Sequence, residues 1–176
     1  MKPIRTCAQW TLPTCALVLS TYAIADIPSA SNDCSPDTLE TTPSNDFTLL
    51  EGGAVVRHEP TGLEWRRCAE GMSWSGDGCS GFSNSFGWRA ALQHADGLPG
   101  WRLPNINELR SIVERCRTSP AINQQVFPDT PETITWTATP SGVDSGRSWY
   151  INFTQGSDGV ISRNNSLRVR LVRGGE

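Results

Sequence analysis

The apolar positions from residue 47 onward first follow the pattern of short strands. Residues 47–50, 54–57 and 63–67 are rich in apolar side chains, and turn residues at Gly52–Gly53 and at Pro60–Gly62 separate them. Short apolar runs bounded by glycine and proline are typical of strands joined by tight turns. These three runs predict a small antiparallel meander.

Two segments with helical spacing follow the meander. In residues 86–96, Ser85 is the expected N-cap and Gly97 the expected stop. In residues 105–116, Asn105 and Glu108 have the spacing of a capping box. Apolar side chains recur on one face of each segment: Trp88, Ala91, Leu92 and Ala95 in the first, and Ile106, Leu109, Ile112, Val113 and Cys116 in the second. The pattern predicts two amphipathic helices.

The rest of the chain alternates between strand-like runs and polar turns. A long connection without helical or strand periodicity joins Cys116 to Trp136, and loops of that length are usually functional or irregularly packed. Strand patterns then occupy residues 134–138, 148–154, 160–163 and 167–172. Strands, two helices, a long loop and further strands predict an α+β domain.

The N-terminal residues have the pattern of a signal peptide. Lys2 and Arg5 precede an apolar stretch at residues 15–19, and Ala23-Ile24-Ala25 is a small-x-small cleavage signal. Pro13, Thr14, Ser20 and Thr21 interrupt this stretch, so it is too short for a membrane anchor. We therefore expect three parts: a signal peptide (1–25), an extended polar arm (26–46) and one domain (47–176). The mature protein is expected to be periplasmic or extracellular, without a membrane span.

The cysteine count supports export. Two of six cysteines fall in the signal peptide, and an even number in an exported chain favours disulfides over free thiols. Four cysteines allow three pairings. We favour Cys68 with Cys79, because this pair brackets a short glycine-rich segment, and Cys34 with Cys116.

No pattern of residues indicates catalysis or a metal centre. The two mature histidines, His58 and His94, have no metal-ligand spacing, and there is no C-x-x-C pair. Neither G-x-S-x-G nor H-E-x-x-H occurs. Paired carboxylates among Asp129, Asp144 and Asp158 stay open, because their separation cannot be derived from sequence. We predict that the protein is not an enzyme and needs no cofactor or metal.

The charge distribution restricts the partners. The 176-residue chain has a net charge of −3, and removal of Lys2 and Arg5 with the signal peptide makes it −5. An acidic chain is a poor general ligand for nucleic acid, because phosphate contacts need cations. Residues 145–176 are locally basic, with five arginines against two acids. An anionic ligand would therefore bind near that end.

Several motifs taken together resemble a known family. They are Gly62-Leu-Glu-Trp-Arg-Arg-Cys68, Trp74 to Cys79, Trp88-Arg-Ala-Ala-Leu92, Trp101-Arg-Leu-Pro-Asn-Ile-Asn-Glu-Leu109, Pro120-Ala-Ile-Asn123, Val126-Phe-Pro128, Trp136 and Val169-Arg-Leu-Val-Arg-Gly-Gly175. The order of these motifs resembles the Lcl C-terminal domain family, named after a bacterial collagen-like adhesin. The resemblance implies a C-type-lectin-like variant, and the adhesin binds sulfated glycosaminoglycans through this domain. The chain lacks the collagen repeats and the Glu-Pro-Asn and Trp-Asn-Asp signatures of calcium-dependent sugar binding.

These observations favour a non-catalytic recognition or adhesion module whose partner is a surface glycan. The alternative is a structural accessory domain of an envelope or pilus assembly that binds protein; the oligomeric state stays open. Arg168 and Arg170 are interpreted as a structural face paired with acids such as Glu108 or Glu114, whereas Arg147 and Arg163 are the better ligand candidates. The pool of candidate ligand-binding residues is Thr137, Thr139, Arg147, Trp149, Asn152, Gln155, Arg163 and Asn165.

Overall fold

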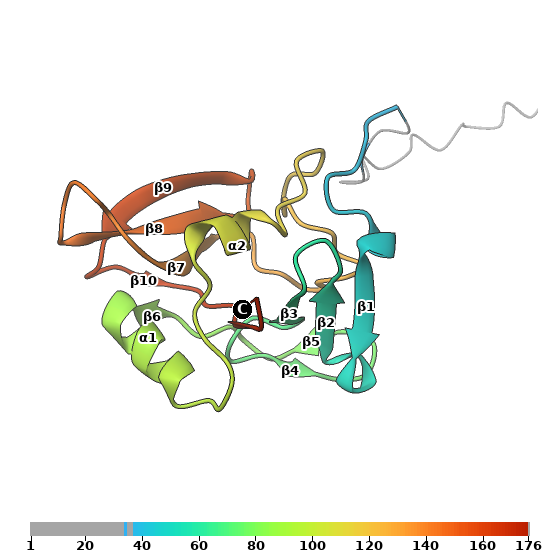
Figure 1. Cartoon of the computed structure of the whole chain (residues 1–176), viewed down its shortest axis with the longest axis horizontal. Coiled ribbons are helices and arrows are strands. Elements are labelled where there is room, and N and C mark those ends of the chain that lie inside the picture. The colour runs from blue at the N-terminus through green and yellow to red at the C-terminus, as the bar shows by residue number, and fades with distance from the viewer. Residues whose placement is uncertain (1–33, 35–36, 176) are drawn as a thin grey trace, which may run out of the picture. The chain divides into compact units, whose positions relative to one another are not determined.

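The computed structural model describes Cys34 and residues 37–175 (Figure 1). They belong to one unit that spans Asn32–Glu176. The expected signal peptide and residues 26–33 of the expected arm lie outside the described residues. Within the described part, none of the helices has the length and apolar character needed to cross a membrane.

The predicted meander is confirmed as part of a four-stranded antiparallel sheet. Its strands, in the order β1-β2-β3-β11, are Phe47–Leu50, Val55–His58, Leu63–Arg66 and Val172–Arg173. Glu51–Gly53 forms the 3-10 turn between β1 and β2, and Gly52 has a φ of 64°, a backbone conformation that glycine adopts without steric cost. Val56 and Trp65 are buried on one face of the sheet, whereas Arg57 and Glu64 point to the other.

Both helices form, with bounds that differ from the prediction. Helix α1 spans Trp88–Asp96. Its N-cap residue is Gly87, so no side chain caps the helix. The predicted cap at Ser85 is wrong, because the Ser85 hydroxyl accepts a bond from Arg168 instead. Helix α2 spans only Ile106–Arg110, with the predicted capping box of Asn105 and Glu108 present.

The early end of α2 has a tertiary cause. The Ser111 hydroxyl bonds to Glu108 O, and Glu114 N bonds to Ala121 O in the long connection. The backbone therefore leaves the helix to pair with a distant segment. Ile112 and Val113, which we predicted as helical core positions, are nevertheless buried.

A second sheet is formed by the C-terminal half. Its strands β7, β8 and β9 are Ile134–Pro140, Arg147–Asn152 and Ser157–Ser162, paired antiparallel in that order. Two small ribbons complete the fold: β4 (Ser73–Trp74) with β5 (Cys79–Ser80), and β6 (Phe86–Gly87) with β10 (Ser166–Leu167). Two helices with separate antiparallel sheets make this an α+β fold, as predicted.

The predicted final strand, residues 167–172, is not one strand. Only its ends belong to strands, β10 and β11, and the backbone between them bonds to several elements. Trp136 N bonds to Arg168 O, Glu70 N to Val169 O and Arg66 N to Leu171 O. The segment therefore connects the two larger sheets, and its apolar alternation reflects burial between layers.

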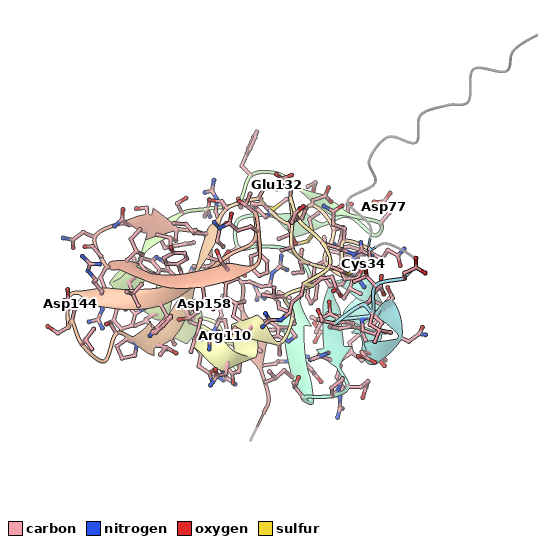
Figure 2. The ribbon with its side chains drawn as sticks, turned by 90° about the horizontal axis from the view of Figure 1, so that it is seen from above. Cys34, Asp77, Arg110, Glu132, Asp144 and Asp158 are labelled. Carbon is pink, nitrogen blue, oxygen red and sulfur yellow. A yellow bond between two sulfur atoms is a disulfide. The ribbon has the colours of Figure 1, made fainter. Side chains whose placement is uncertain are left out.

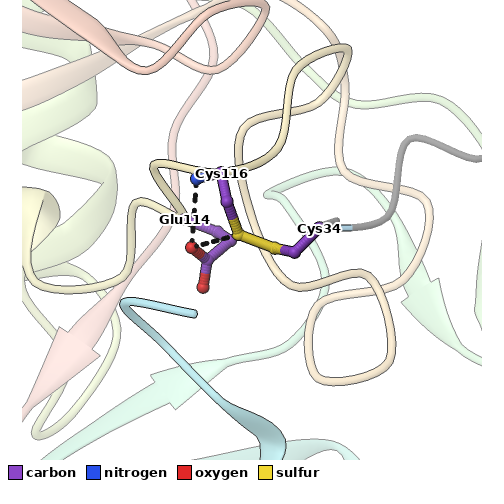
Figure 3. Close-up of side chains that lie close together, drawn as sticks. All are labelled: Cys34, Glu114 and Cys116. Carbon is purple, nitrogen blue, oxygen red and sulfur yellow. Dashed lines mark hydrogen bonds between the residues drawn. A yellow bond between two sulfur atoms is a disulfide. The ribbon is translucent and has the colours of Figure 1, made fainter. Parts of the chain in front are cut away.

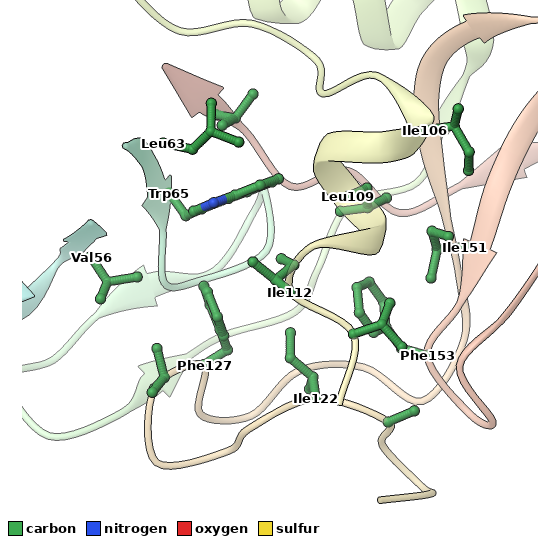
Figure 4. Close-up of a cluster of buried hydrophobic side chains, with 14 residues drawn as sticks. Val56, Leu63, Trp65, Ile106, Leu109, Ile112, Ile122, Phe127, Ile151 and Phe153 are labelled. Carbon is green, nitrogen blue, oxygen red and sulfur yellow. The ribbon is translucent and has the colours of Figure 1, made fainter. Parts of the chain in front are cut away.

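Helix α2 links the two sheets through the largest core cluster (Figure 4). Trp65 from β3, Leu109 from α2 and Ile151 from β8 are each fully buried in it. A second cluster around Trp136 lies against α1. Each helix therefore presents its apolar face to the sheets, as the spacing of residues predicted.

Two disulfides are formed. The predicted Cys68–Cys79 bond is confirmed, with the two Cα atoms 5.5 Å apart, and it closes the loop that contains β4. Cys34 is bonded to Cys116, with a Cα separation of 5.1 Å. Disulfides of this kind fit an exported protein.

The end of the polar arm is held by a buried carboxylate. Glu114 is fully buried and accepts bonds from Thr41 N at 2.9 Å and Thr42 N at 2.7 Å, and from both threonine hydroxyls. Cys34, Glu114 and Cys116 lie close together (Figure 3). Because the two sulfurs are bonded to each other, neither is the thiolate that a metal would need. The cluster therefore ties the arm to the body.

Candidate functional site

The candidate residues are spread over the three-stranded sheet. Arg147 opposes Ser162, and Arg163 N bonds to Gly146 O, at one end of the β8–β9 pair. Asn152, which opposes Ser157, lies at the other end. Figure 2 labels Asp144 and Asp158, the ion-pair partners of Arg147 and Arg110, in these two regions. The pool therefore divides into separate groups.

Three members of the pool have internal structural roles. Thr137 is fully buried and donates its hydroxyl to Trp149 O, and the Thr139 hydroxyl accepts Ile106 N at the start of α2. The Asn152 amide oxygen accepts Thr154 N in the β8–β9 turn. Because each side chain is engaged in holding backbone, these residues support the sheet rather than form its outer surface.

Trp149 and its neighbours form a group in the middle of the sheet. The guanidinium of Arg110 lies 5.6 Å from the centre of the Trp149 ring and pairs with Asp158 at 2.8 Å. Trp149 is half-buried. The charge above the ring is thus already balanced by a carboxylate.

Two further members of the pool are exposed amides. The Gln155 amide bonds to Ser157 Oγ, and the Asn165 amide bonds to Ser162 O.

Arg163 has the most distinctive environment in the pool. Its guanidinium carbon lies 3.9 Å from the centre of the Trp88 ring, and its Nε donates to Ser148 Oγ at 2.8 Å. Trp88 in turn donates its indole N–H to Thr137 O. The stack and the Nε bond fix the plane of the guanidinium. No other described residue accepts a bond from either Nη atom of Arg163.

A pocket of about 370 Å³ opens beside this stack. Its lining residues come from the start of α1, the β7–β8 loop and the end of β9: Trp88, Arg89, Gly146, Ser162, Arg163 and Asn164. Arg89 is exposed and makes no ion pair with any described residue. Arg147 pairs with Asp144 at 3.2 Å nearby, and both side chains are about half exposed, so the pair is weak. The pocket thus has two guanidinium groups without carboxylate partners and one indole.

This arrangement suits an oxyanion. A guanidinium held in one plane presents two parallel N–H donors that match the oxygens of a sulfate or carboxylate. The neighbouring indole gives an apolar surface for the group that carries the anion. The pocket contains neither a histidine nor a carboxylate, the usual groups for proton transfer.

Sequence reasoning missed Trp88 and Arg89. The interpretation of Trp88 as a packing residue is confirmed, because it packs against the second core cluster and its indole N–H bonds to Thr137 O. Its partial exposure at the first position of α1 was not expected. The signal was Gly87, which ends β6 and begins α1 and so places Trp88 and Arg89 at a surface corner.

The two arginines near the end are structural, but their partners are not the acids we expected. Arg170 is buried and donates to the backbone oxygens of Arg66 and Arg67 and to Thr130 Oγ1. Burial lowers its pKa to about 9, so it stays charged at neutral pH. Arg168 donates to Ser83 O and Ser85 Oγ. The predicted pairing with Glu108 or Glu114 is wrong, because Glu108 binds Arg102 and Glu114 binds the arm.

Comparison with known proteins gives one family. The model of the Lcl C-terminal domain matches residues 54–173, which is more than half of the chain. No curated protein matches the chain. The matched range begins just before β2 and ends at the last residue of β11. It includes both helices, the three-stranded sheet and the four-stranded sheet except β1.

Proposed function

The chain belongs to the Lcl C-terminal domain family, and from this membership we propose that it is a non-catalytic recognition module that acts outside the cytoplasm. Its ligand is a surface glycan that carries sulfate or carboxylate groups. The family is adhesin-like, and the two disulfides fit export. A C-type-lectin-like arrangement of the domain is part of the proposal.

The observation that carries the proposal is the Arg163 guanidinium. It is held by Trp88 and Ser148, and neither its Nη atoms nor the neighbouring Arg89 bond to a carboxylate of the described part of the chain. Arg170 uses its Nη atoms on backbone oxygens and a threonine hydroxyl, whereas the Nη atoms of Arg163 are available as donors to an external anion.

The test is an array of neutral, carboxylated and sulfated glycans probed with the full chain and with two variants. We expect sulfated or carboxylated glycans to bind, and Arg163→Ala to weaken this binding by about tenfold or more. Arg57→Ala is the matched control, because Arg57 is an exposed arginine on the other sheet. Equal binding by Arg163→Ala and the unaltered chain would refute the proposal.

The rival function is that of an accessory domain that binds an envelope protein. A pull-down from envelope extract, run beside the array, separates the two. The rival function would be supported if no glycan on the array binds, one protein is recovered in a stoichiometric amount, and its binding is lost in Arg163→Ala. The same surface would then bind protein.

A further inference from the structure

Another pocket lies away from the Arg163 site, on the outer face of the four-stranded sheet. Its volume is about 420 Å³, within the range of about 300–1,000 Å³ typical of small-molecule sites. Val55 and Arg66 of the sheet form one side, and Ser73 and Trp74 of the β4–β5 ribbon form another. We propose that this pocket binds an uncharged pyranose unit of a saccharide, a site and ligand class distinct from the anion site above.

Two tryptophans supply the apolar surfaces. Trp74 and Trp101 both line the pocket and are partly exposed. The guanidinium groups of Arg66 and Arg173 lie 5.0 Å and 4.6 Å from the centre of the Trp101 ring, so the ligand meets the part of this indole that they leave uncovered. The Arg67 guanidinium lies 4.2 Å from the centre of the Trp74 ring. Because Arg67 is buried and does not line the pocket, it supports the indole from behind. The C–H groups of a pyranose face carry a small positive charge and pack well on the negative face of an indole.

Each charged side chain in the lining of the pocket has an oppositely charged partner or a hydrogen-bond partner among the described residues. Arg66 bonds to the buried Glu70 at 3.1 Å, and Glu51 bonds to Arg173 at 2.6 Å. An ionic ligand would have to break one of these pairs. An uncharged ligand needs only atoms that form no hydrogen bond with another described residue: Nε and Nη2 of Arg66, the second oxygen of Glu51 and the Ser73 hydroxyl. These donors and acceptors suit the hydroxyl groups of a sugar.

The lining is held in place before any ligand arrives. Glu70 accepts a second bond from His94 at 2.6 Å, which fixes the carboxylate that positions Arg66. Trp74 donates its indole N–H to Gly52 O at 3.1 Å. The Cys68–Cys79 bond joins the strand β5 to the chain just after β3. Little conformational entropy is therefore lost on binding, which raises the affinity that a small polar ligand can reach.

A proline-rich peptide is the other ligand that aromatic grooves commonly bind. Such grooves recognise the peptide through indole N–H groups that donate to its carbonyls, and the N–H of Trp74 is already used within the protein. The charged pair of Arg66 and Glu70 in the lining also favours a ligand rich in hydroxyls over an apolar one.

The experiment follows the tryptophan indole N–H signals of the ¹⁵N-labelled chain by NMR. The probes are neutral methyl glycosides and neutral oligosaccharides at millimolar concentration, a proline-rich peptide, and a sulfated oligosaccharide. We expect at least one neutral saccharide to shift the Trp74 and Trp101 signals, and Trp101→Ala to weaken that binding about tenfold.

A second pair of variants keeps the test decisive if Trp101→Ala fails to fold. Glu51→Ala should weaken neutral saccharide binding, and Glu59→Ala, an equally exposed acid paired with Arg57 outside the pocket, should not. The proposal is overturned if no neutral saccharide shifts these signals, if the shifts survive both Trp101→Ala and Glu51→Ala, or if only the peptide causes them. Arg163→Ala should affect the sulfated probe alone, so failure at one site is distinguishable from failure at the other.

Discussion

At the scale of single residues, arginine has two distinct roles in this chain. Arg170 is buried and donates to backbone oxygens and a hydroxyl, whereas Arg163 is held by an indole and a hydroxyl and its Nη atoms bond to no other described residue. Arg170 alternates with apolar residues, whereas Arg163 precedes a polar turn, and the acceptors around the two guanidinium groups differ accordingly.

Replacement of Arg170 should be strongly destabilising. Arg170→Leu leaves the oxygens of Arg66 and Arg67 and the Thr130 hydroxyl without their donor inside the protein. We expect a loss of about 3 kcal/mol in the free energy of unfolding, measured by urea denaturation. Arg168→Leu, which removes bonds at a partly exposed position, should cost about 1 kcal/mol. Equal losses in the two variants would contradict the structural role of Arg170.

Glu114 should make attachment of the arm depend on pH. Burial by itself raises the pKa of this carboxyl, but bonds from the backbone of Thr41, Thr42 and Cys116 outweigh burial and lower the pKa below its ordinary value of 4.5. The stabilisation is therefore complete above pH 4.5 and is lost as the pH falls through the lower pKa of the folded state.

Hydrogen exchange measures this effect directly. Relative to an unfolded peptide at the same pH, the amides of Thr41 and Thr42 should be protected from exchange at neutral pH and lose this protection in acid. Glu114→Gln should remove the protection at both pH values. Glu132→Gln, an exposed acid on another loop (Figure 2), is the control. Slow exchange of both amides in Glu114→Gln would show that other contacts hold the arm.

At the scale of elements, short ribbons and turns depend on covalent ties more than on their own strand pairing. Strands β4 and β5 pair over only two residues each, and the Cys68–Cys79 bond closes an 11-residue separation around them. A two-stranded ribbon of this size is not stable alone. The disulfide is thus what keeps Trp74 in the wall of the larger pocket.

The pairing of the cysteines can be checked by mass spectrometry of peptides from the unreduced protein. We expect peptides that join Cys68 to Cys79 and Cys34 to Cys116. The double variant Cys68→Ala with Cys79→Ala should lose about 3 kcal/mol of stability. Peptides that join Cys34 to Cys68, or four free thiols, would contradict this framework.

At the scale of the whole molecule, net and local charge act in opposite directions. The full chain carries −3, yet the Arg163 pocket has two arginines and no acid in its lining. Anion binding must therefore depend on short-range contacts, and its strength must fall as salt screens them.

The two proposed sites should differ in their response to salt. An increase from about 0.05 M to 0.5 M NaCl should weaken binding of a sulfated glycan on the order of tenfold. The same increase should leave the affinity for a neutral saccharide nearly unchanged, because an uncharged ligand neutralises no charge in the pocket. Titration calorimetry at three salt concentrations measures both, and an equal salt dependence would contradict the separation of the sites.

The sequence by itself determined the elements whose signals are local. Apolar spacing and turn residues indicated β1 to β3 and the helix cores, and the capping box of Asn105 and Glu108 marked the start of α2 correctly. The short glycine-rich loop indicated the Cys68–Cys79 bond. These features succeed because each depends on neighbours within about one turn of helix or one hairpin.

Tertiary structure decided everything that depends on distant partners. The bond from Glu114 N to Ala121 O ends α2 early, and contacts with both sheets break the expected final strand into two. The candidate site likewise combines Trp88 with Arg163, 75 residues apart, while Thr137 turns inward to bond with Trp149 O. Alternation along one strand gives the face of a side chain but not what lies above that face, and only the packed fold brings those groups together.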